Sequence, residues 1–231
     1  MDANENLFAA RFNSSDVTVY SKKRVFKKYF AIDDYELSYK TYGGNESRKL
    51  LREIFERDQE AVAILPYDRD TGEILLIEQF RPGALRDPKT PWLVEIVAGM
   101  IDEGESPLQA AVRELREEAR LEVAPEQLHL VTAEYSSPGG TSERIYIYTA
   151  GVSLAHISSH GGLESENEDI RIFKVKASDA FEQCRAGGRI CNGTALIAIQ
   201  HFQIYFDQYM KLKNPQLIFG ASVPQTPSAG A

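Results

Sequence analysis

Short runs of β-forming residues follow one another along most of this chain, and no other feature limits its fold as strongly. The runs are rich in β-branched and aromatic residues, as in AVAILPY at 61–67 and EILLIEQF at 73–80, which the turn-forming sequence YDRDTGE joins, and in WLVEIV at 92–97. Helical periodicity is confined to three segments, at 106–119, 178–186 and 193–212. Strands interrupted by a few isolated helices predict mixed α/β or α+β layers, not the regular alternation of a parallel fold.

The length and the local composition of the chain predict its domain organisation. A chain of 231 residues can bury the core of one domain and carry a smaller appendage. A break near residues 57–61 suggests an N-terminal strand module at 1–57 and a main domain at 58–215. Residues 216–231 are rich in Pro, Ser, Gly and Ala, which predicts a disordered tail.

The charge balance narrows the choice of partner. A net charge of −8 argues against binding to nucleic acid or to an anionic membrane. An anionic substrate would need local arginines, lysines or bound cations to offset the repulsion. The two cysteines, Cys184 and Cys191, fit free thiols in a reducing compartment. Since there is neither a signal-peptide pattern nor an apolar run near the ~18 residues of a membrane helix, we expect a cytoplasmic protein.

The segment 95–121, EIVAGMIDEGESPLQAAVRELREEARL, carries the most specific information. Ser106, Pro107 and Gln109 form a helix start with a capping box. Apolar residues of this helix fall on one stripe, while Glu114 and Glu118 stack four residues apart on another face. The sequence therefore predicts a capped helix with an apolar face and an acidic face.

Stacked carboxylates repel one another, so the acidic face needs an explanation. Arg113 and Arg116 can offset part of the repulsion, and a hard divalent cation such as Mg²⁺, which prefers oxygen ligands, would offset more. Such a cation would also bridge an acidic site to an anionic substrate. The alternative interpretation is a solvated acidic helix face, which is common in Glu/Arg-rich stretches.

The spacing of the whole segment resembles a known signature. Gly99, Glu105, the triplet Arg113-Glu114-Leu115 and the pair Glu117-Glu118 stand at the offsets of the Nudix box, the loop–helix–loop motif of Nudix hydrolases. One position departs, because Arg120 stands where the box has a Gly that suits a left-handed helix end. If that geometry is kept, we expect a local cost of about 1 kcal/mol and retained catalysis.

Within the Nudix family, the chain resembles the ADP-ribose pyrophosphatase group. The resemblance covers most of residues 17–210, including Pro138, and lies in LLREIFERD, ILLIEQFRPGA, TPWLVEIVAGMIDEGES, SSPGGTSERIYIY and GLESENEDIRI. It implies an α/β fold, a Nudix α/β/α sandwich with a mixed sheet plus an N-terminal β-strand module. It also implies a homodimer built by exchange of that module, and Mg²⁺-dependent cleavage of ADP-ribose to AMP and ribose 5-phosphate, with Mn²⁺ as an alternative metal.

The same resemblance assigns site residues. The metal ligands would be Glu114, Glu118, the carbonyl of Ala98, and Glu168 in the acidic loop HGGLESENEDI. Glu166 in that loop would be the catalytic base, with Glu168 as the alternative, on a segment that closes over the substrate. The residues that would contact the substrate are Tyr29, Phe30, Arg52, Glu53, Arg57, Arg81, Met100, Ser137 and Glu143.

Other functions stay open on the sequence alone. The same metal site could serve another nucleoside diphosphate sugar such as GDP-mannose. A non-catalytic nucleotide-sugar sensor is a different class, against which the intact Glu105, Glu114 and Glu118 argue. A scaffold protein with a merely solvated acidic helix would bind no Mg²⁺.

Overall fold

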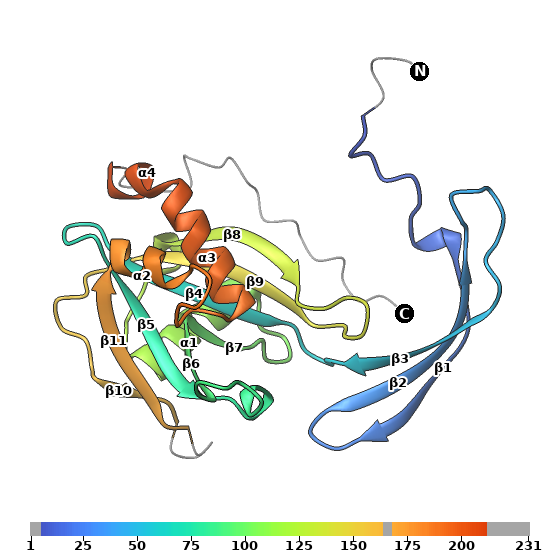
Figure 1. Cartoon of the computed structure of the whole chain (residues 1–231), viewed down its shortest axis with the longest axis horizontal. Coiled ribbons are helices and arrows are strands. Elements are labelled where there is room, and N and C mark those ends of the chain that lie inside the picture. The colour runs from blue at the N-terminus through green and yellow to red at the C-terminus, as the bar shows by residue number, and fades with distance from the viewer. Residues whose placement is uncertain (1–5, 164–167, 212–231) are drawn as a thin grey trace. The chain divides into compact units, whose positions relative to one another are not determined.

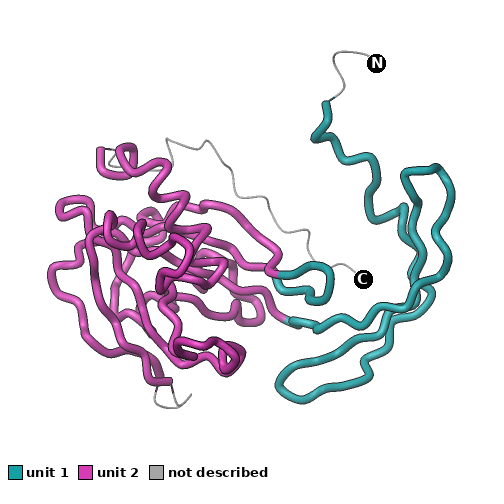
Figure 2. The backbone as a smooth tube through the Cα atoms, in the orientation of Figure 1, with its two compact units in different colours: residues 1–58, 137–143 teal, residues 59–136, 144–231 magenta. Residues whose placement is uncertain are grey.

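The computed structural model describes residues 6–163 and 168–211 and divides into two compact units (Figure 2). The smaller unit comprises Met1–Asp58 with Ser137–Glu143, and the larger comprises Gln59–Ser136 with Arg144–Ala231. The tail at 216–231, for which disorder was predicted, lies outside the described residues.

The smaller unit is built on a three-stranded antiparallel sheet in the order β1-β2-β3 (Figure 1). Its elements are a 3₁₀ turn at Ser14–Asp16, β1 at Val17–Lys27, β2 at Ala31–Tyr39 and β3 at Leu50–Glu56. Asp33 on β2 is buried, and its carboxylate accepts hydrogen bonds from Arg24 Nε at 2.8 Å and Nη2 at 3.1 Å. The cross-strand guanidinium of Arg24 lowers the pKa of Asp33, which keeps the buried carboxyl charged and paired.

The larger unit contains a mixed sheet. Its central order is β10-β11-β5-β4-β9-β8, with β6 beside β5 and β7 beside β4. The β4–β9 pair is parallel and the other pairs are antiparallel. The strands are β4 at Ala61–Asp68, β5 at Glu73–Phe80, β6 at Trp92–Glu95, β7 at Val97–Met100, β8 at Leu128–Tyr135, β9 at Arg144–Gly151, β10 at His160–Gly161 and β11 at Ile170–Lys176.

Helices cover both faces of this sheet. Val62 and Ile64 of β4 pack in the core that contains α1, Pro107–Ala119, whereas Ala63 and Leu65 pack in the core on the other face. The second core is covered by α2 at Ala177–Gln183, α3 at Gly193–Ile204 and α4 at Phe206–Lys211 (Figure 1). Alternate residues of a strand point to opposite faces, so this strict alternation builds the α/β/α sandwich with a mixed sheet that was predicted.

The predicted turn at 67–73 is present. The Asp68 carboxylate accepts hydrogen bonds from the backbone N–H groups of Asp70 at 2.9 Å and Thr71 at 3.1 Å. Its other oxygen accepts from Leu154 N at 2.7 Å. One buried carboxylate therefore both forms the β4–β5 turn and ties it to the segment after β9.

Two predicted elements are divided in the structure. The run at 92–97 forms two strands, because β6 pairs with β5 up to Glu95 while β7 pairs with β4 from Val97. The helix expected at 193–212 is interrupted at Tyr205, whose backbone φ of −110° and ψ of 21° leave the helical region. In the described part of the chain, no helix is both long enough and apolar enough to cross a membrane.

Candidate active site

Local signals at both ends position the acidic helix α1. Ser106 Oγ accepts a hydrogen bond from Gln109 N, and Gln109 Oε1 accepts one from Ser106 N at 2.9 Å, so the predicted capping box is formed. At the other end Arg120 adopts the left-handed conformation, with φ 57° and ψ 32°, and its N–H bonds to the Leu115 carbonyl. The helix end thus keeps the geometry that favours glycine, although an arginine occupies it.

Glu114 and Glu118 are buried, with 8% and 4% of their surface exposed. Burial of two carboxylates one helical turn apart excludes a merely solvated acidic face for this pair. Both residues face β7: Glu118 Oε2 accepts a hydrogen bond from Ala98 N at 3.1 Å, and Glu114 lies against Gly99.

Close packing makes two glycines necessary around this pair. A Cβ at Gly99 would stand 1.9 Å from Glu114 Oε1, so a side chain there would displace the carboxylate. A Cβ at Gly161 of β10 would stand 1.8 Å from the Glu118 carbonyl oxygen. Because neither position has room for a side chain, β7 and β10 approach α1 closely at the acidic residues.

A nearby positive charge would stabilise the ionised form of this buried pair. Burial raises the pKa of Glu114 to about 7, against the opposing effect of Arg113. Burial also raises the pKa of Glu118 to about 8, and the negative charges of Glu114 and Glu168 add to the rise. The Ala98 N–H and the guanidinium of Arg81 act in the opposite direction. Carboxyl groups whose pKa values are raised by burial and by mutual repulsion favour a bound cation, because the cation stabilises their charged form.

Arg113 supplies part of that charge from within the helix. Its Nε and Nη2 bind both oxygens of Glu105 at 3.1 and 2.8 Å. Its Nη1 donates to Glu114 at 2.7 Å and Glu117 at 3.1 Å, and its Nη2 also reaches the Met100 carbonyl at 2.8 Å. One planar guanidinium therefore joins the loop before the helix, the helix and β7.

The donor set suits a hard dication. Within residues 6–163 and 168–211, no three Asp, Glu, His or Cys side chains are grouped closely enough to hold a metal ion by themselves. The oxygens available are the carboxylates of Glu114 and Glu118, the carbonyl of Ala98, and Glu168, which is close enough to raise the pKa of both glutamates. These are the ligand types that Mg²⁺ prefers, completed by water and substrate oxygens. Glu166 lies outside the described residues.

Arg81 reaches the same region from the end of β5, and its charge lowers the pKa of Glu118. Its Nε donates to Glu95 Oε2 at 2.8 Å, and Glu95 Oε1 accepts from Asn192 Nδ2 at 2.9 Å. Glu95 is only 5% exposed. Glu95 is not among the site residues predicted from the sequence, although a lone carboxylate within the apolar strand WLVEIV is a signal that could have identified it.

Gln79 on β5 is also missing from the sequence-based site. It follows Leu75 and Ile77 on the strand face that packs toward α1. It is 6% exposed, and its Nε2 has no hydrogen-bond partner in the described part of the chain. An unpaired buried amide is costly, which makes Gln79 a candidate donor to a bound ligand.

Four of the predicted substrate residues come together in the smaller unit. The guanidinium of Arg57 lies 5.2 Å from the ring centre of Phe30 and 3.4 Å from Glu143 Oε1. Tyr29 packs edge-on against Phe30, with ring centres 4.8 Å apart, and remains 76% exposed. Arg57 N donates to Ser142 Oγ at 2.7 Å, which attaches the 137–143 loop to the end of β3. This cluster offers aromatic faces and one cation to a ligand.

The remaining predicted residues have separate surroundings. Arg52 and Glu53 are exposed neighbours on β3 and so project to opposite faces of the small sheet. Ser137 is exposed, and its carbonyl accepts hydrogen bonds from Gly140 N and Thr141 N. Met100 ends β7 and contributes its carbonyl to Arg113.

The chain is similar to proteins of known family. The family model described as NUDIX domain matches residues 57–186. The chain is 39% identical over 203 residues to an ADP-ribose pyrophosphatase of Escherichia coli (strain K12), covering 88% of this chain and 94% of that protein. An ADP-ribose pyrophosphatase of Haemophilus influenzae is 33% identical over 200 residues, covering 85% and 90%.

Two further comparisons extend the range of relatives. A GDP-mannose pyrophosphatase of Yersinia pestis (strain Pestoides F) is 31% identical over 182 residues, covering 78% of this chain and 88% of that protein. A crystal structure described as an ADP compounds hydrolase superposes with a TM-score of 0.62 at 20% identity, covering 85% of this chain and 97% of that one. At that identity the structural likeness concerns the fold.

Proposed function

The chain belongs to the Nudix hydrolase family, and on this premise we propose that it hydrolyses the pyrophosphate bond of ADP-ribose to AMP and ribose 5-phosphate with Mg²⁺. The observation that carries the proposal is the buried pair Glu114 and Glu118, held against Gly99 and the Ala98 N–H on a capped helix. Two buried carboxylates with raised pKa values beside an arginine suit a cation bound to a diphosphate.

The residues of the chain have distinct tasks in this proposal. Glu114, Glu118, the Ala98 carbonyl and Glu168 would hold Mg²⁺, with Mn²⁺ as the alternative. A metal bound there would neutralise charge at the phosphates and lower the pKa of a bound water. Glu166 accepts the proton of the attacking water, with Glu168 as the alternative base.

Substrate binding uses the two groups of residues already described. Arg81, beside the carboxylate pair, suits a phosphate oxygen because a guanidinium donates several hydrogen bonds in a fixed fork. Tyr29 and Phe30 suit an adenine ring, and Arg57 and Glu143 suit polar groups near it. Arg52, Glu53, Met100 and Ser137 complete the proposed contacts.

We also propose a homodimer formed through the smaller unit. The strand β1 is exposed along its whole length, and its exposed apolar side chains include Val19, Val25 and Phe26. Apolar side chains gathered on one exposed strand are typical of an interaction surface. Light scattering during gel filtration tests this, and a monomer at micromolar concentration would refute it.

Product analysis tests the proposed reaction. The protein is incubated with ADP-ribose and Mg²⁺, with and without a chelator, and AMP and ribose 5-phosphate are quantified. We expect both products only when Mg²⁺ is free, and almost none from Glu118→Gln. Intact ADP-ribose with fully folded protein would refute the proposal.

A second substrate is favoured by one relative. The Yersinia pestis protein named GDP-mannose pyrophosphatase is 31% identical to this chain. Measurement of kcat/KM for ADP-ribose and for GDP-mannose under identical conditions would distinguish the two substrates. A larger kcat/KM for GDP-mannose would keep the metal site and change the assigned substrate.

A further inference from the structure

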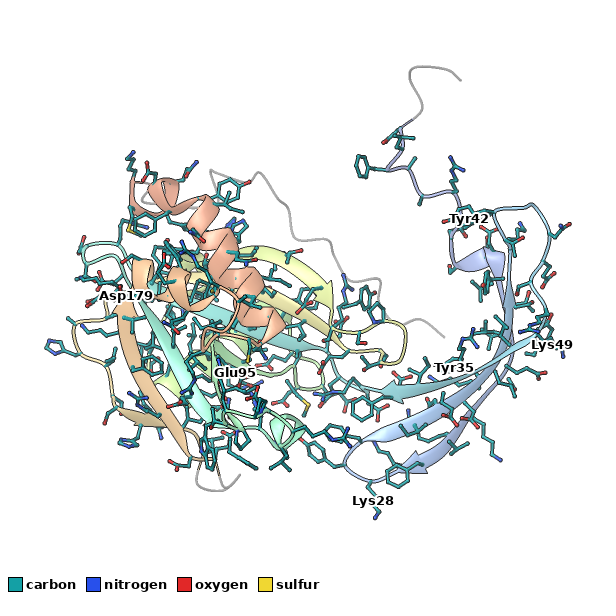
Figure 3. All side chains as sticks on the ribbon, viewed as in Figure 1. Lys28, Tyr35, Tyr42, Lys49, Glu95 and Asp179 are labelled. Atoms are coloured by element: carbon teal, nitrogen blue, oxygen red, sulfur yellow. The ribbon has the colours of Figure 1, made fainter. Side chains whose placement is uncertain are left out.

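Arg81 is tied into a three-residue chain that crosses between elements of the larger unit. Its Nε donates to Glu95, and Glu95 in turn accepts from Asn192 at the start of α3. Glu95 stands where the polypeptide passes from β6, paired with β5, to β7, paired with β4. Figure 3 labels Glu95 within the larger unit. Both carboxylate oxygens are therefore engaged, each by a different side chain.

Asn192 itself is fixed by a second role. Its Oδ1 accepts a hydrogen bond from Ala195 N at 3.0 Å and so caps α3. With Oδ1 bound to the helix, the amide group is oriented and Nδ2 points at Glu95. A capped helix thereby sets the rotamer of the carboxylate that holds the arginine.

The geometry leaves the outer part of Arg81 available. Among the described residues, its side chain makes one hydrogen bond, through Nε, so Nη1 and Nη2 remain for a ligand. Glu95, which holds Arg81, stands three residues before Ala98, whose N–H binds Glu118, so the same stretch of chain carries the arginine and contacts the carboxylate pair. An exposed arginine loses side-chain entropy when it binds a phosphate, and prior fixing through Nε lowers that cost.

We propose that Glu95 and Asn192 are positioning residues that hold Arg81 ready for a phosphate group of a nucleoside diphosphate substrate. This rests on the proposed function. Neither residue touches the substrate; both act through the orientation of one guanidinium. Their loss therefore weakens substrate binding and leaves the chemical step largely intact.

Two substitutions separate this role from simple structural support. Glu95→Gln keeps the shape of the side chain, but its amide N–H would face one of the two donors, Arg81 Nε or Asn192 Nδ2. Asn192→Ser keeps a good helix cap and removes the donor to Glu95. The matched control is Glu134→Gln, because Glu134 accepts a hydrogen bond from Thr194 Oγ1 at 2.8 Å at the same end of α3 but is not connected to Arg81.

The measurement is binding of ADP-ribose with a methylene group in place of the bridging oxygen, by calorimetry with Mg²⁺, together with kcat and KM for ADP-ribose. We expect Arg81→Ala and Glu95→Gln each to raise Kd and KM about 10- to 100-fold, as for hydrogen bonds to charged groups, and Asn192→Ser to raise them less. Glu134→Gln should leave both unchanged. Thermal unfolding verifies that each variant is folded, and Asn192→Ser decides the question if Glu95→Gln does not fold.

A double-mutant cycle gives the decisive result. If Glu95 acts through Arg81, the double variant Arg81→Ala/Glu95→Gln binds no worse than Arg81→Ala alone. Additive losses, or an unchanged Kd in the folded Glu95→Gln and Asn192→Ser variants, would overturn the positioning role. An unchanged Kd in Arg81→Ala would overturn it too. A wild-type protein that neither binds the analogue nor cleaves ADP-ribose would instead overturn the proposed function.

Discussion

Replacing Gly99 by alanine tests whether the space beside Glu114 is required for the proposed metal site. The new Cβ would stand 1.9 Å from Glu114 Oε1 and 2.0 Å from its Cδ. The backbone of Gly99 does not need a positive φ, so alanine introduces no backbone strain. The perturbation is therefore one methyl group aimed at one carboxylate.

The size of the effect follows from the distances. Ordinary van der Waals contact begins at 3.4 Å, so the carboxylate oxygen must retreat from 1.9 Å by about 1.5 Å, or β7 must move away from α1. A misplacement of about 1 Å at a reacting centre costs on the order of 100-fold in rate. We expect kcat/KM to fall by about 100-fold or more. Overpacking would cost about 1–3 kcal/mol of stability.

The assay is the initial rate of ADP-ribose cleavage over a Mg²⁺ titration. We expect a higher Mg²⁺ concentration at half-maximal rate, since one ligand is displaced. Gly193→Ala is the matched control, because its Cβ would meet open space at the first residue of α3. Wild-type kcat/KM and an unchanged Mg²⁺ titration in Gly99→Ala would refute the assignment of Glu114 as a ligand.

Three further outcomes are expected. Glu166→Gln lowers kcat by about 10²–10⁴ while calorimetry still detects Mg²⁺ binding, whereas near-normal turnover would remove Glu166 from the role of base. Arg120→Gly removes the backbone strain of an arginine in the left-handed conformation at φ 57°. We expect the free energy of unfolding, measured by urea denaturation, to rise by up to about 1 kcal/mol with kcat unchanged, and a lower free energy of unfolding would show that this strain is absent. Burial, with a smaller effect of His201, lowers the pKa of His129 from 6.5 to about 4, so the unfolded chain binds the proton first. The free energy of unfolding is therefore unaffected by His129 well above pH 6.5 and decreases as the pH falls toward 4, by about 2 kcal/mol at pH 5. If a His129→Leu protein lost the same free energy of unfolding over this pH range, the loss would belong to other groups.

Local patterns predicted the elements that local forces determine. The start of α1 was predictable because Ser106, Pro107 and Gln109 satisfy the first turn by themselves. The left-handed end at Arg120 was predictable from its place in the motif, and the β4–β5 turn from the residues that build it. Strand runs interrupted by isolated helices indicated mixed layers, and the family resemblance implied the sandwich.

Long-range contacts determine what the sequence did not show. The run at 92–97 has no break in its β-forming character. It nevertheless changes its pairing partner at Ile96, from β5 before this residue to β4 after it. Nothing in the residues around Tyr205 marks the end of α3, since neither proline nor glycine stands there. Glu95 and Asn192 are 97 positions apart, so their hydrogen bond became visible only in the folded chain.

The Arg113 guanidinium binds Glu105, Glu114 and Glu117 and also reaches the Met100 carbonyl. The loop before α1, the helix and β7 therefore depend on one another through a single side chain. A change in any one of these three segments would disturb the other two, although they are separate elements in the sequence.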